Sequence, residues 1–219
     1  MESSRMKILS AAQRVYAEHG FRGATTRRIA ETAGVNEVTL FRIFGSKDAL
    51  LEEAVRPNAT RREVAVLTSE PADPEAELTA WVSAQLTFLR DRRSLIRKAM
   101  SEIEERPQFV ACIREGPECA HRALSDYLAA LVDRGWVERS PELGAAIAML
   151  MGTVFGDAMG REMIPENYPS PIEDAPRAYA RLFLRAIGLR QQPARAGNGR
   201  TTAVPDGRRP SHRSGTSPR

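Results

Sequence analysis

The side chains best suited to reading another molecule lie on one face of a short segment. Glu37, Thr39 and Arg42 carry hydrogen-bonding groups, and Val38 and Phe41 are apolar neighbours on the same side. An arginine can bond a guanine edge or a phosphate, a glutamate can accept from a cytosine amino group, and a valine can contact a thymine methyl. This combination favours a surface that reads base edges in a DNA groove over an ordinary solvated helix face.

A helix has to hold this face, and the flanking residues predict one with defined ends. Leu40 and Phe44 recur at i, i+4, the spacing that buries one stripe of a helix. Asn36 is a suitable cap for the start of this helix, and Gly34 and Gly45 suit helix ends because glycine adopts a positive φ without cost. The sequence therefore predicts a short helix with Glu37 and Arg42 on its exposed side.

A second short helix precedes the first and is joined to it by the turn at Gly34. Thr25 or Thr26 can cap this helix, and Ile29 with its neighbouring alanines gives it a small apolar face. Two short helices joined by a glycine turn form a helix-turn-helix, whose second helix enters the major groove of DNA. Ser46 then begins a further helix.

Other residues near helix starts suit the phosphates of a DNA backbone. Thr26 and Arg27 lie at one helix start and Lys47 at another, where amides and cations attract anions. The predicted DNA-contacting residues are Thr26, Arg27, Arg28, Asn36, Glu37, Val38, Thr39, Phe41, Arg42 and Lys47.

The stretch from Gly20 to Leu51, GFRGATTRRIAETAGVNEVTLFRIFGSKDALL, resembles the DNA-binding signature of the TetR family of one-component repressors. The resemblance spans about the first quarter of the chain and is dense, which makes it more specific than a lone helix-turn-helix pattern. It departs from the family at Phe41, where the family has tyrosine, and at Ile43, where it has histidine. Two polar backbone contacts are therefore in doubt, and Arg42 and the basic tail are candidates to replace them.

The resemblance implies a homodimeric repressor that binds a double-stranded DNA operator and is released by a hydrophobic or cationic small-molecule effector. Three alternatives stay open: a TetR-like regulator without an effector or acting as an activator, a nonspecific nucleoid-type DNA binder, and a helical enzyme or transport-associated protein. The nonspecific binder is disfavoured by charge. The chain carries +4 overall, but residues 190–219 hold seven arginines and one acid, so the remaining residues carry −2.

Helical spacing of apolar residues recurs along the whole chain, and no stretch shows the alternation of a β-strand. The predicted fold is all-α, with a first helix from Met6 to about Ala17 that ends at Gly20, and a kink at Pro57. We predict a helix-turn-helix DNA-binding domain over residues 1–56, a helical effector-binding and dimerisation domain over 57–189, and a flexible basic tail over 190–219.

Later helices are predicted from the same periodicity, with a break at Gly116-Pro117 and an irregular proline-rich loop over about residues 161–171. Apolar and soft side chains on these helices are mostly core residues, but the resemblance implies an effector site among them. The candidates for that site are Trp81, Gln85, Phe88, Met100, Phe109, Tyr127 and Met151.

Small residues recur at every fourth position from Gly144 through Ala148 and Gly152 to Gly156 and Gly160. Glycine lowers helix propensity by about 1 kcal/mol per residue, a cost that is explained if another helix approaches closely. The resemblance implies a dimer formed through the last two helices, near residues 141–156 and 174–188.

No catalytic or metal-binding constellation is recognisable, so we expect neither enzyme activity nor a cofactor. His19, His121 and His212 lack metal-ligand spacing, and Cys112 and Cys119 are better interpreted as small buried thiols than as a redox pair. No signal peptide is recognisable, and the longest uncharged run, from residue 143 to 156, is too short to span a bilayer. The expected location is the cytoplasm, with no membrane partner.

Overall fold

The computed structural model describes residues 3–56, 67–107 and 109–190, and within these residues it contains helices and turns but no strand. The predicted all-α fold is therefore confirmed for the described part of the chain. The predicted kink at Pro57 and the basic tail beyond Arg190 lie outside the described residues. The helices are α1 (Ser4–Gly23), α2 (Thr26–Ala33), α3 (Glu37–Phe44), α4 (Lys47–Val55), α5 (Pro74–Asp91), α6 (Arg93–Ser101), α7 (Phe109–Asp133), α8 (Leu143–Gly160) and α9 (Ala175–Ala186), with short 3₁₀ turns at Pro165–Asn167 and Ile172–Asp174.

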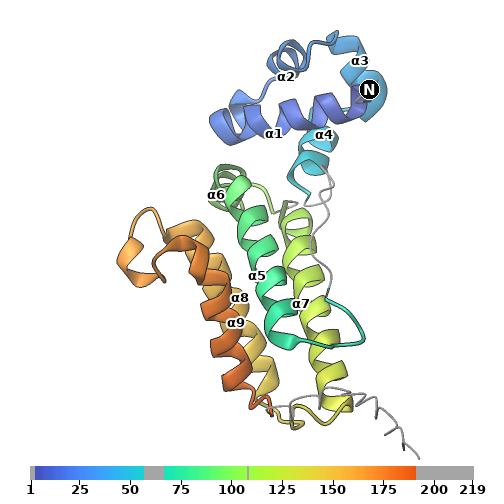
Figure 1. Ribbon diagram of the computed structural model, residues 1–219. Coiled ribbons are helices and arrows are strands. Elements are labelled where there is room, and N and C mark those ends of the chain that lie inside the picture. The colour runs from blue at the N-terminus through green and yellow to red at the C-terminus, as the bar shows by residue number, and fades with distance from the viewer. Residues whose placement is uncertain (1–2, 57–66, 108, 191–219) are drawn as a thin grey trace, which may run out of the picture.

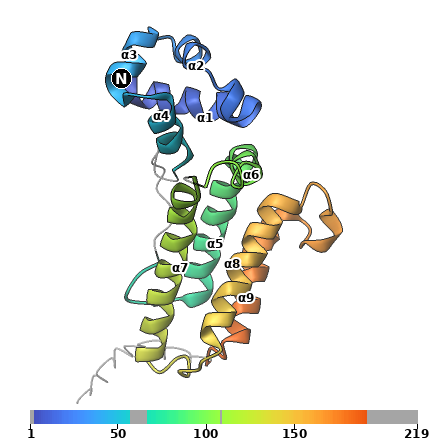
Figure 2. The same cartoon turned by 180° about the vertical axis from the view of Figure 1, so that it is seen from behind.

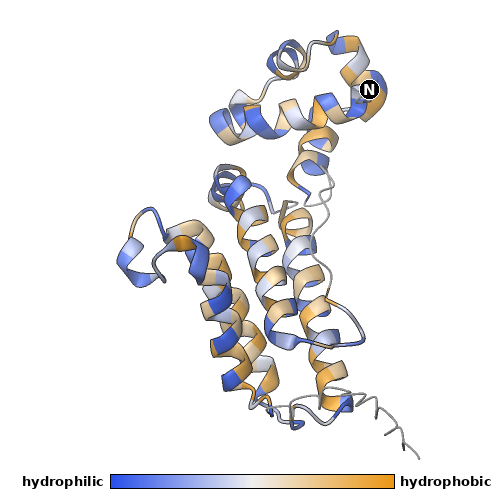
Figure 3. Cartoon of the chain, viewed as in Figure 1, coloured by the Kyte–Doolittle hydropathy of each residue, from blue (hydrophilic) through white to orange (hydrophobic). Residues whose placement is uncertain are grey.

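Helices α1 to α4 form one unit at the end of an elongated molecule, and α5, α7, α8 and α9 form a bundle beneath it (Figure 1). Seen from behind, α8 and α9 run side by side along one flank of this bundle, and α5 and α7 lie along the other (Figure 2). Hydrophobic residues recur along all the bundle helices (Figure 3). Helix α6 lies between the unit and the bundle and contacts both α1 and α8.

The ends of α2, α3 and α4 are fixed by the residues that the sequence indicated. The Thr25 hydroxyl accepts from the Arg28 amide, and Ser46 caps α4 in the same way. Gly34 closes α2 with a φ of 66°, a left-handed conformation that costs a residue with a side chain more than it costs glycine. These local capping predictions are confirmed, and together they fix the angle at which α3 leaves α2.

The first helix is longer than predicted. It begins at Ser4, where the Ser3 side chain caps it, and reaches Gly23 after an interruption at Gly20. Gly20 has a φ of 65° and a ψ of −175°, so the predicted break at this residue is confirmed even though a further helical turn follows it.

The first hydrophobic core is not confined to helices α1 to α4. Leu95 and Ala99 of α6 and Phe109 and Cys112 of α7 are buried in the same cluster as α1 residues such as Tyr16. Phe109 is fully buried, which corresponds to roughly 2–3 kcal/mol of transfer free energy. The division at residue 56 therefore stays a prediction about the chain's domains, since part of the first core comes from beyond it.

The predicted break at Gly116-Pro117 is wrong, because α7 runs without interruption from Phe109 to Asp133 with Pro117 inside it. The fixed φ of proline is compatible with a helix, and the cost is one lost amide hydrogen bond and a steric clash. Both ends of α7 are buried, with Phe109 in the first core and Leu124 and Tyr127 in the second. Packing at both ends thus offsets the cost of the proline.

Candidate nucleic-acid interface

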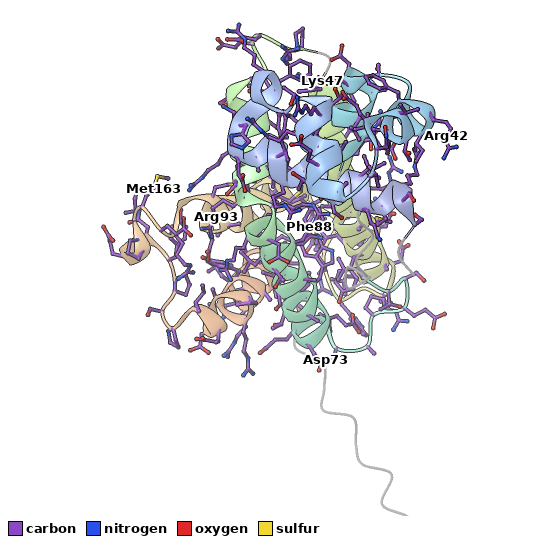
Figure 4. The ribbon with its side chains drawn as sticks, turned by 90° about the horizontal axis from the view of Figure 1, so that it is seen from above. Arg42, Lys47, Asp73, Phe88, Arg93 and Met163 are labelled. Atoms are coloured by element: carbon purple, nitrogen blue, oxygen red, sulfur yellow. The ribbon has the colours of Figure 1, made fainter. Side chains whose placement is uncertain are left out.

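Helix α3 buries one stripe and exposes the other. Leu40 is fully buried and Phe44 is 9% exposed, whereas Val38 is 73% and Phe41 is 45% exposed. Arg42 is also exposed, and it projects outward from the edge of the unit (Figure 4). The structure therefore exposes Val38, Phe41 and Arg42 of the predicted reading face on one side of a short helix, whereas Glu37 and Thr39 are half-buried.

The start of α3 is tied to the start of α2 by a hydrogen bond that the sequence did not indicate. The Thr26 hydroxyl donates to the Glu37 carboxylate, and the Asn36 side chain accepts from the Val38 amide at 2.8 Å. Both Thr26 and Glu37 were predicted to contact DNA directly. In this structure Glu37 already holds a partner, so it acts at least in part to fix α3 against α2.

The two arginines that follow Thr26 also have partners within their own unit. The Arg27 Nε lies 2.9 Å from a Glu31 carboxylate oxygen one turn along α2. The Arg28 Nη1 donates at 2.7 Å to the carbonyl of Gly23, the last residue of α1. Both side chains remain exposed and have further donors, so contact with phosphates is compatible with these bonds.

Lys47 is held more firmly than the sequence indicated. Its Nζ donates at 2.6 Å to the Phe21 carbonyl and lies 4.4 Å from the centre of the Phe21 ring. Burial lowers its pKa below the ordinary lysine value, because desolvation disfavours the charged form. An ammonium has three donors, so Lys47 can hold the turn after Gly20 and still meet a phosphate. Figure 4 shows Lys47 within the outline of the unit, in contrast to Arg42.

The same turn is held from the other side by residues that sequence reasoning missed. Glu102, just after α6, accepts from the Tyr16 hydroxyl at 2.8 Å and from the Phe21 amide at 3.1 Å. The Arg106 guanidinium lies over the Phe21 ring at 3.2 Å from its centre. These partners are more than 80 residues apart in the chain, so no local spacing could have indicated them.

The residues predicted to bind an effector are not gathered in one place. Trp81 and Tyr127 lie in the second core, where the Tyr127 hydroxyl donates to Glu77 at 2.6 Å. Phe109 lies instead in the first core, with ring centres 6.1 Å from Tyr16 and 5.9 Å from Phe21, and Met100 of α6 is 47% exposed. Gln85, Phe88 and Met151 are partly buried on α5 and α8.

Asp157 of α8 is a fully buried carboxylate whose role the sequence did not indicate. The Asp157 side chain accepts from Arg90 of α5 at 3.0 Å, from the Arg161 Nε at 2.7 Å and from the Tyr179 hydroxyl of α9 at 2.7 Å. Burial alone would raise its pKa, but these hydrogen bonds outweigh burial and hold the pKa at about 2. Asp157 thus joins three helices of the bundle.

No cluster of metal-ligating side chains occurs within the described ranges. Cys112 and Cys119 are both free thiols, the first buried and the second exposed. Seven helical residues separate their Cα atoms by about 10 Å, which is too far for a disulfide. The interpretation of both as buried thiols is therefore wrong for Cys119, since α7 turns it to the surface.

The capped helix-turn-helix and the exposed face of α3 define a DNA-binding protein of the helix-turn-helix class. Residues 8–54 match the family model described as bacterial regulatory proteins, tetR family. The chain is 28% identical over 188 residues to the HTH-type transcriptional regulator YvkB of Bacillus subtilis, covering 85% of this chain and 98% of that protein. It is also 34% identical over 100 residues to the transcriptional repressor AcnR of Corynebacterium efficiens, covering 42% of this chain and 52% of AcnR.

Solved structures share the fold over most of this chain. A TetR-family transcriptional regulator from Mesorhizobium loti superposes with a TM-score of 0.68 at 23% identity, over 84% of this chain and 96% of that one. FadR from Bacillus subtilis, solved in complex with stearoyl-CoA, superposes with a TM-score of 0.58 at 20% identity, over 83% and 96%. Residues 8–54 thus carry the DNA-binding domain described by the tetR family model, and most of the chain is similar to transcriptional regulators with this domain and fold.

Proposed function

We propose that this regulator binds a two-fold symmetric operator as a homodimer, with α3 of each protomer in a major groove. The observation that carries this proposal is the exposed face of α3 on a unit in which the start of every helix is capped by a side chain. A dimer of such units fits two half-sites about one helical turn of DNA apart. Repression is the mode of action proposed, as for the repressor AcnR, in the cytoplasm.

The contacts divide into base reading and backbone positioning. Arg42, Thr39 and Val38 are the proposed base readers, because Arg42 and Val38 are exposed and Thr39 lies on the same side of α3, opposite the buried Leu40 and Phe44. Arg28 and Lys47 are proposed to contact phosphates through the N–H groups that are not used in their intramolecular hydrogen bonds. Phe41, where the family has tyrosine, offers only its ring.

The dimer is proposed to form through the exposed flank of α8 and α9. Helix α8 has a mean hydropathy of 1.5 over Leu143–Gly160, which by length and composition alone would suffice to cross a membrane, yet only 28% of this window is buried. The same helix carries Asp157 among two arginines, which argues for packing against protein. Met149 of α8 and Leu182 of α9 are 71% and 66% exposed, an apolar surface suited to a second copy.

Only part of the stripe of small residues is open for that second copy. A side chain added at Gly144 or Gly152 would meet no atom within 4 Å. At Gly160 it would meet the Tyr168 hydroxyl at 2.7 Å, and this hydroxyl donates to the Gly156 carbonyl at 2.9 Å. The expectation that a helix covers the whole stripe is therefore wrong for its end, where the chain's own tyrosine takes that place.

A hydrophobic or cationic small molecule is proposed to bind in the bundle, among α5, α7 and α8, and to release the protein from DNA. The fold neighbour FadR, crystallised with stearoyl-CoA, supports the hydrophobic class. DNA and effector would each favour a different placement of the two recognition helices. By linkage, each ligand then weakens the binding of the other by the same factor.

Selection of binding sites from random duplex DNA tests the proposal. The expected result is enrichment of an inverted repeat whose half-sites are protected together in footprinting, and a dimer in sedimentation of the complex. Enrichment of no sequence, or of a single unpaired half-site bound by one chain, would refute the operator model. A thermal-shift screen with acyl-CoA thioesters and hydrophobic cations then tests the effector.

A further inference from the structure

Helix α6 presents opposite faces to the two parts of the molecule. Leu95 and Ala99 are buried in the first core, at 6% and 1% exposure. Arg93 and Arg97 lie two positions away from them, about 200° around the helix, and reach the end of α8. A short helix thus has an apolar face in the DNA-binding unit and an arginine face on the bundle.

The apolar face is fixed to the DNA-binding unit by more than burial. Glu102, directly after α6, accepts from the Tyr16 hydroxyl and the Phe21 amide, as described above. Tyr16 is fully buried and Glu102 is largely buried, so these bonds are shielded from water. A displacement of α6 therefore carries the DNA-binding unit with it.

The arginine face pairs with backbone carbonyls of α8 that have no partner in their own helix. The last four carbonyls of a helix lack an intrahelical donor. Arg93 Nε donates at 2.6 Å to the Ala158 carbonyl, and Arg97 Nη2 donates to the Met159 carbonyl. The carbonyls on either side of this pair accept backbone amides from the following turn. Among the described residues, α6 thus completes the hydrogen bonding of the end of α8.

These contacts fix an orientation as well as a distance. Backbone carbonyls at a helix end point in one direction, and contacts from two arginines to neighbouring carbonyls allow little sliding. The positive charge of the guanidinium groups also suits the negative end of the α8 dipole. The residue directly before Ala158 is Asp157, which joins α8 to α5 and α9. A change in how α8 packs would therefore move the carbonyls that α6 contacts.

We propose that Arg93 and Arg97 are positioning residues that set the placement of the DNA-binding unit relative to α8, and through it the distance between the two recognition helices of the dimer. This inference rests on the proposed dimer through α8 and α9. It assigns the transmission between that dimer and DNA to the contacts that two arginines make at the end of α8. These are the Arg93–Ala158 and Arg97–Met159 carbonyl bonds and the Arg93–Glu162 ion pair, which together we call the α8 clamp.

Operators with altered half-site spacing test the α8 clamp. In the site selected by the native protein, the spacer between the half-sites is lengthened or shortened by one or two base pairs. Each added or removed base pair also rotates one half-site by about 34° relative to the other. The native dimer should prefer its own spacing by about tenfold over a one-base-pair change, a penalty comparable to that of one mismatched base pair in the site. Arg93→Gln and Arg97→Gln should flatten this preference while leaving affinity for an isolated half-site unchanged.

Arg114→Gln is the matched control. Arg114 is exposed and pairs with Glu118 within α7, and its replacement changes the net charge by the same amount. It should keep the native spacing preference. Arg97→Lys should restore part of that preference, because it retains a donor and a charge near the Met159 carbonyl. The isolated half-site separates this effect from damage to α3 or its unit.

Two results would overturn the inference. One is a native spacing preference in both glutamine variants. The other is an equal loss of affinity at every spacing and at the half-site together with a lower Tm, which would show that the arginines only stabilise the fold. Failure of the native protein to enrich paired half-sites is seen before any variant is compared, and would refute the proposed function and this inference together.

Discussion

Replacing Asp157 with asparagine should destabilise the bundle strongly, although the two side chains have nearly the same shape. The carboxylate is fully buried and accepts from Arg90, Arg161 and Tyr179. An asparagine amide would place its own donors against a guanidinium and would leave two cations without a counter-charge. Arg90 and Arg161 are themselves 23% and 12% exposed, so water relieves them only in part.

Removal of one partner from a buried ion pair costs roughly 3–5 kcal/mol. The residual exposure of the arginines favours the lower end of this range. For a chain of this size about 1 kcal/mol corresponds to 2–4 °C in Tm, so Asp157→Asn should lower the Tm by roughly 6–12 °C. Trp81 and Trp136 both pack in or against the second core, so tryptophan fluorescence reports this transition.

The pH dependence of the free energy of unfolding is a second measure of the contribution of Asp157. Its pKa is about 2 in the folded protein against 3.8 without its partners, so its contribution is fully present above about pH 4 and is lost as the pH falls toward 2. The shift corresponds to about 2 kcal/mol. The native protein should lose this amount over that interval, and Asp157→Asn should not.

Asp133→Asn serves as the control. Asp133 is 74% exposed and lies 3.9 Å from Arg139, a surface pair of the kind that contributes little. The Tm of the Asp133→Asn protein should stay within about 2 °C of the native value. An Asp157→Asn protein that is as stable as this control, with an unchanged acid limb, would refute the assignment of a stabilising charged network to Asp157.

Three further variants test the DNA-binding and association surfaces. Arg42→Ala should weaken operator binding by roughly 1–3 kcal/mol and relax the preference at one base pair in each half-site, measured by competition with single-base variants. Lys47→Ala should lower the salt slope of binding by about 1 without changing sequence preference, and should also lower the Tm because the Phe21 carbonyl loses its donor. Gly152→Leu should weaken self-association in sedimentation while retaining the helical signal, because its Cβ is open within the chain. A Gly152→Leu protein as dimeric as the native one would place the interface elsewhere.

The sequence predicted the structure best where the physical cause is local. Thr25, Gly34, Asn36 and Ser46 each act on a backbone group within three or four residues, and all four behave as predicted. The buried stripe of α3 follows from the same short-range periodicity. A cap or a turn carries its own partner in its sequence neighbourhood, so no knowledge of the tertiary fold is required.

Prediction failed where a side chain finds its partner across the fold. Glu102 reaches Phe21, and Arg90 reaches Asp157, over separations that no periodicity encodes. The same reason explains Phe109, whose apolar character predicted burial but not which of two cores receives it. The proline in α7 was misjudged because its cost is local, while the packing that offsets it is not.

The sharing of the first core between α1–α4, α6 and α7 restricts the motions that could accompany the proposed release from DNA. A shift of α6 against the bundle can proceed in two ways. Either Leu95 and Ala99 leave their places in the first core, or the whole DNA-binding unit moves with α6. Repacking a close-packed core costs several kcal/mol, since each displaced side chain leaves a cavity. Moving the unit as a rigid body leaves that core intact, so the recognition helix should move without being deformed.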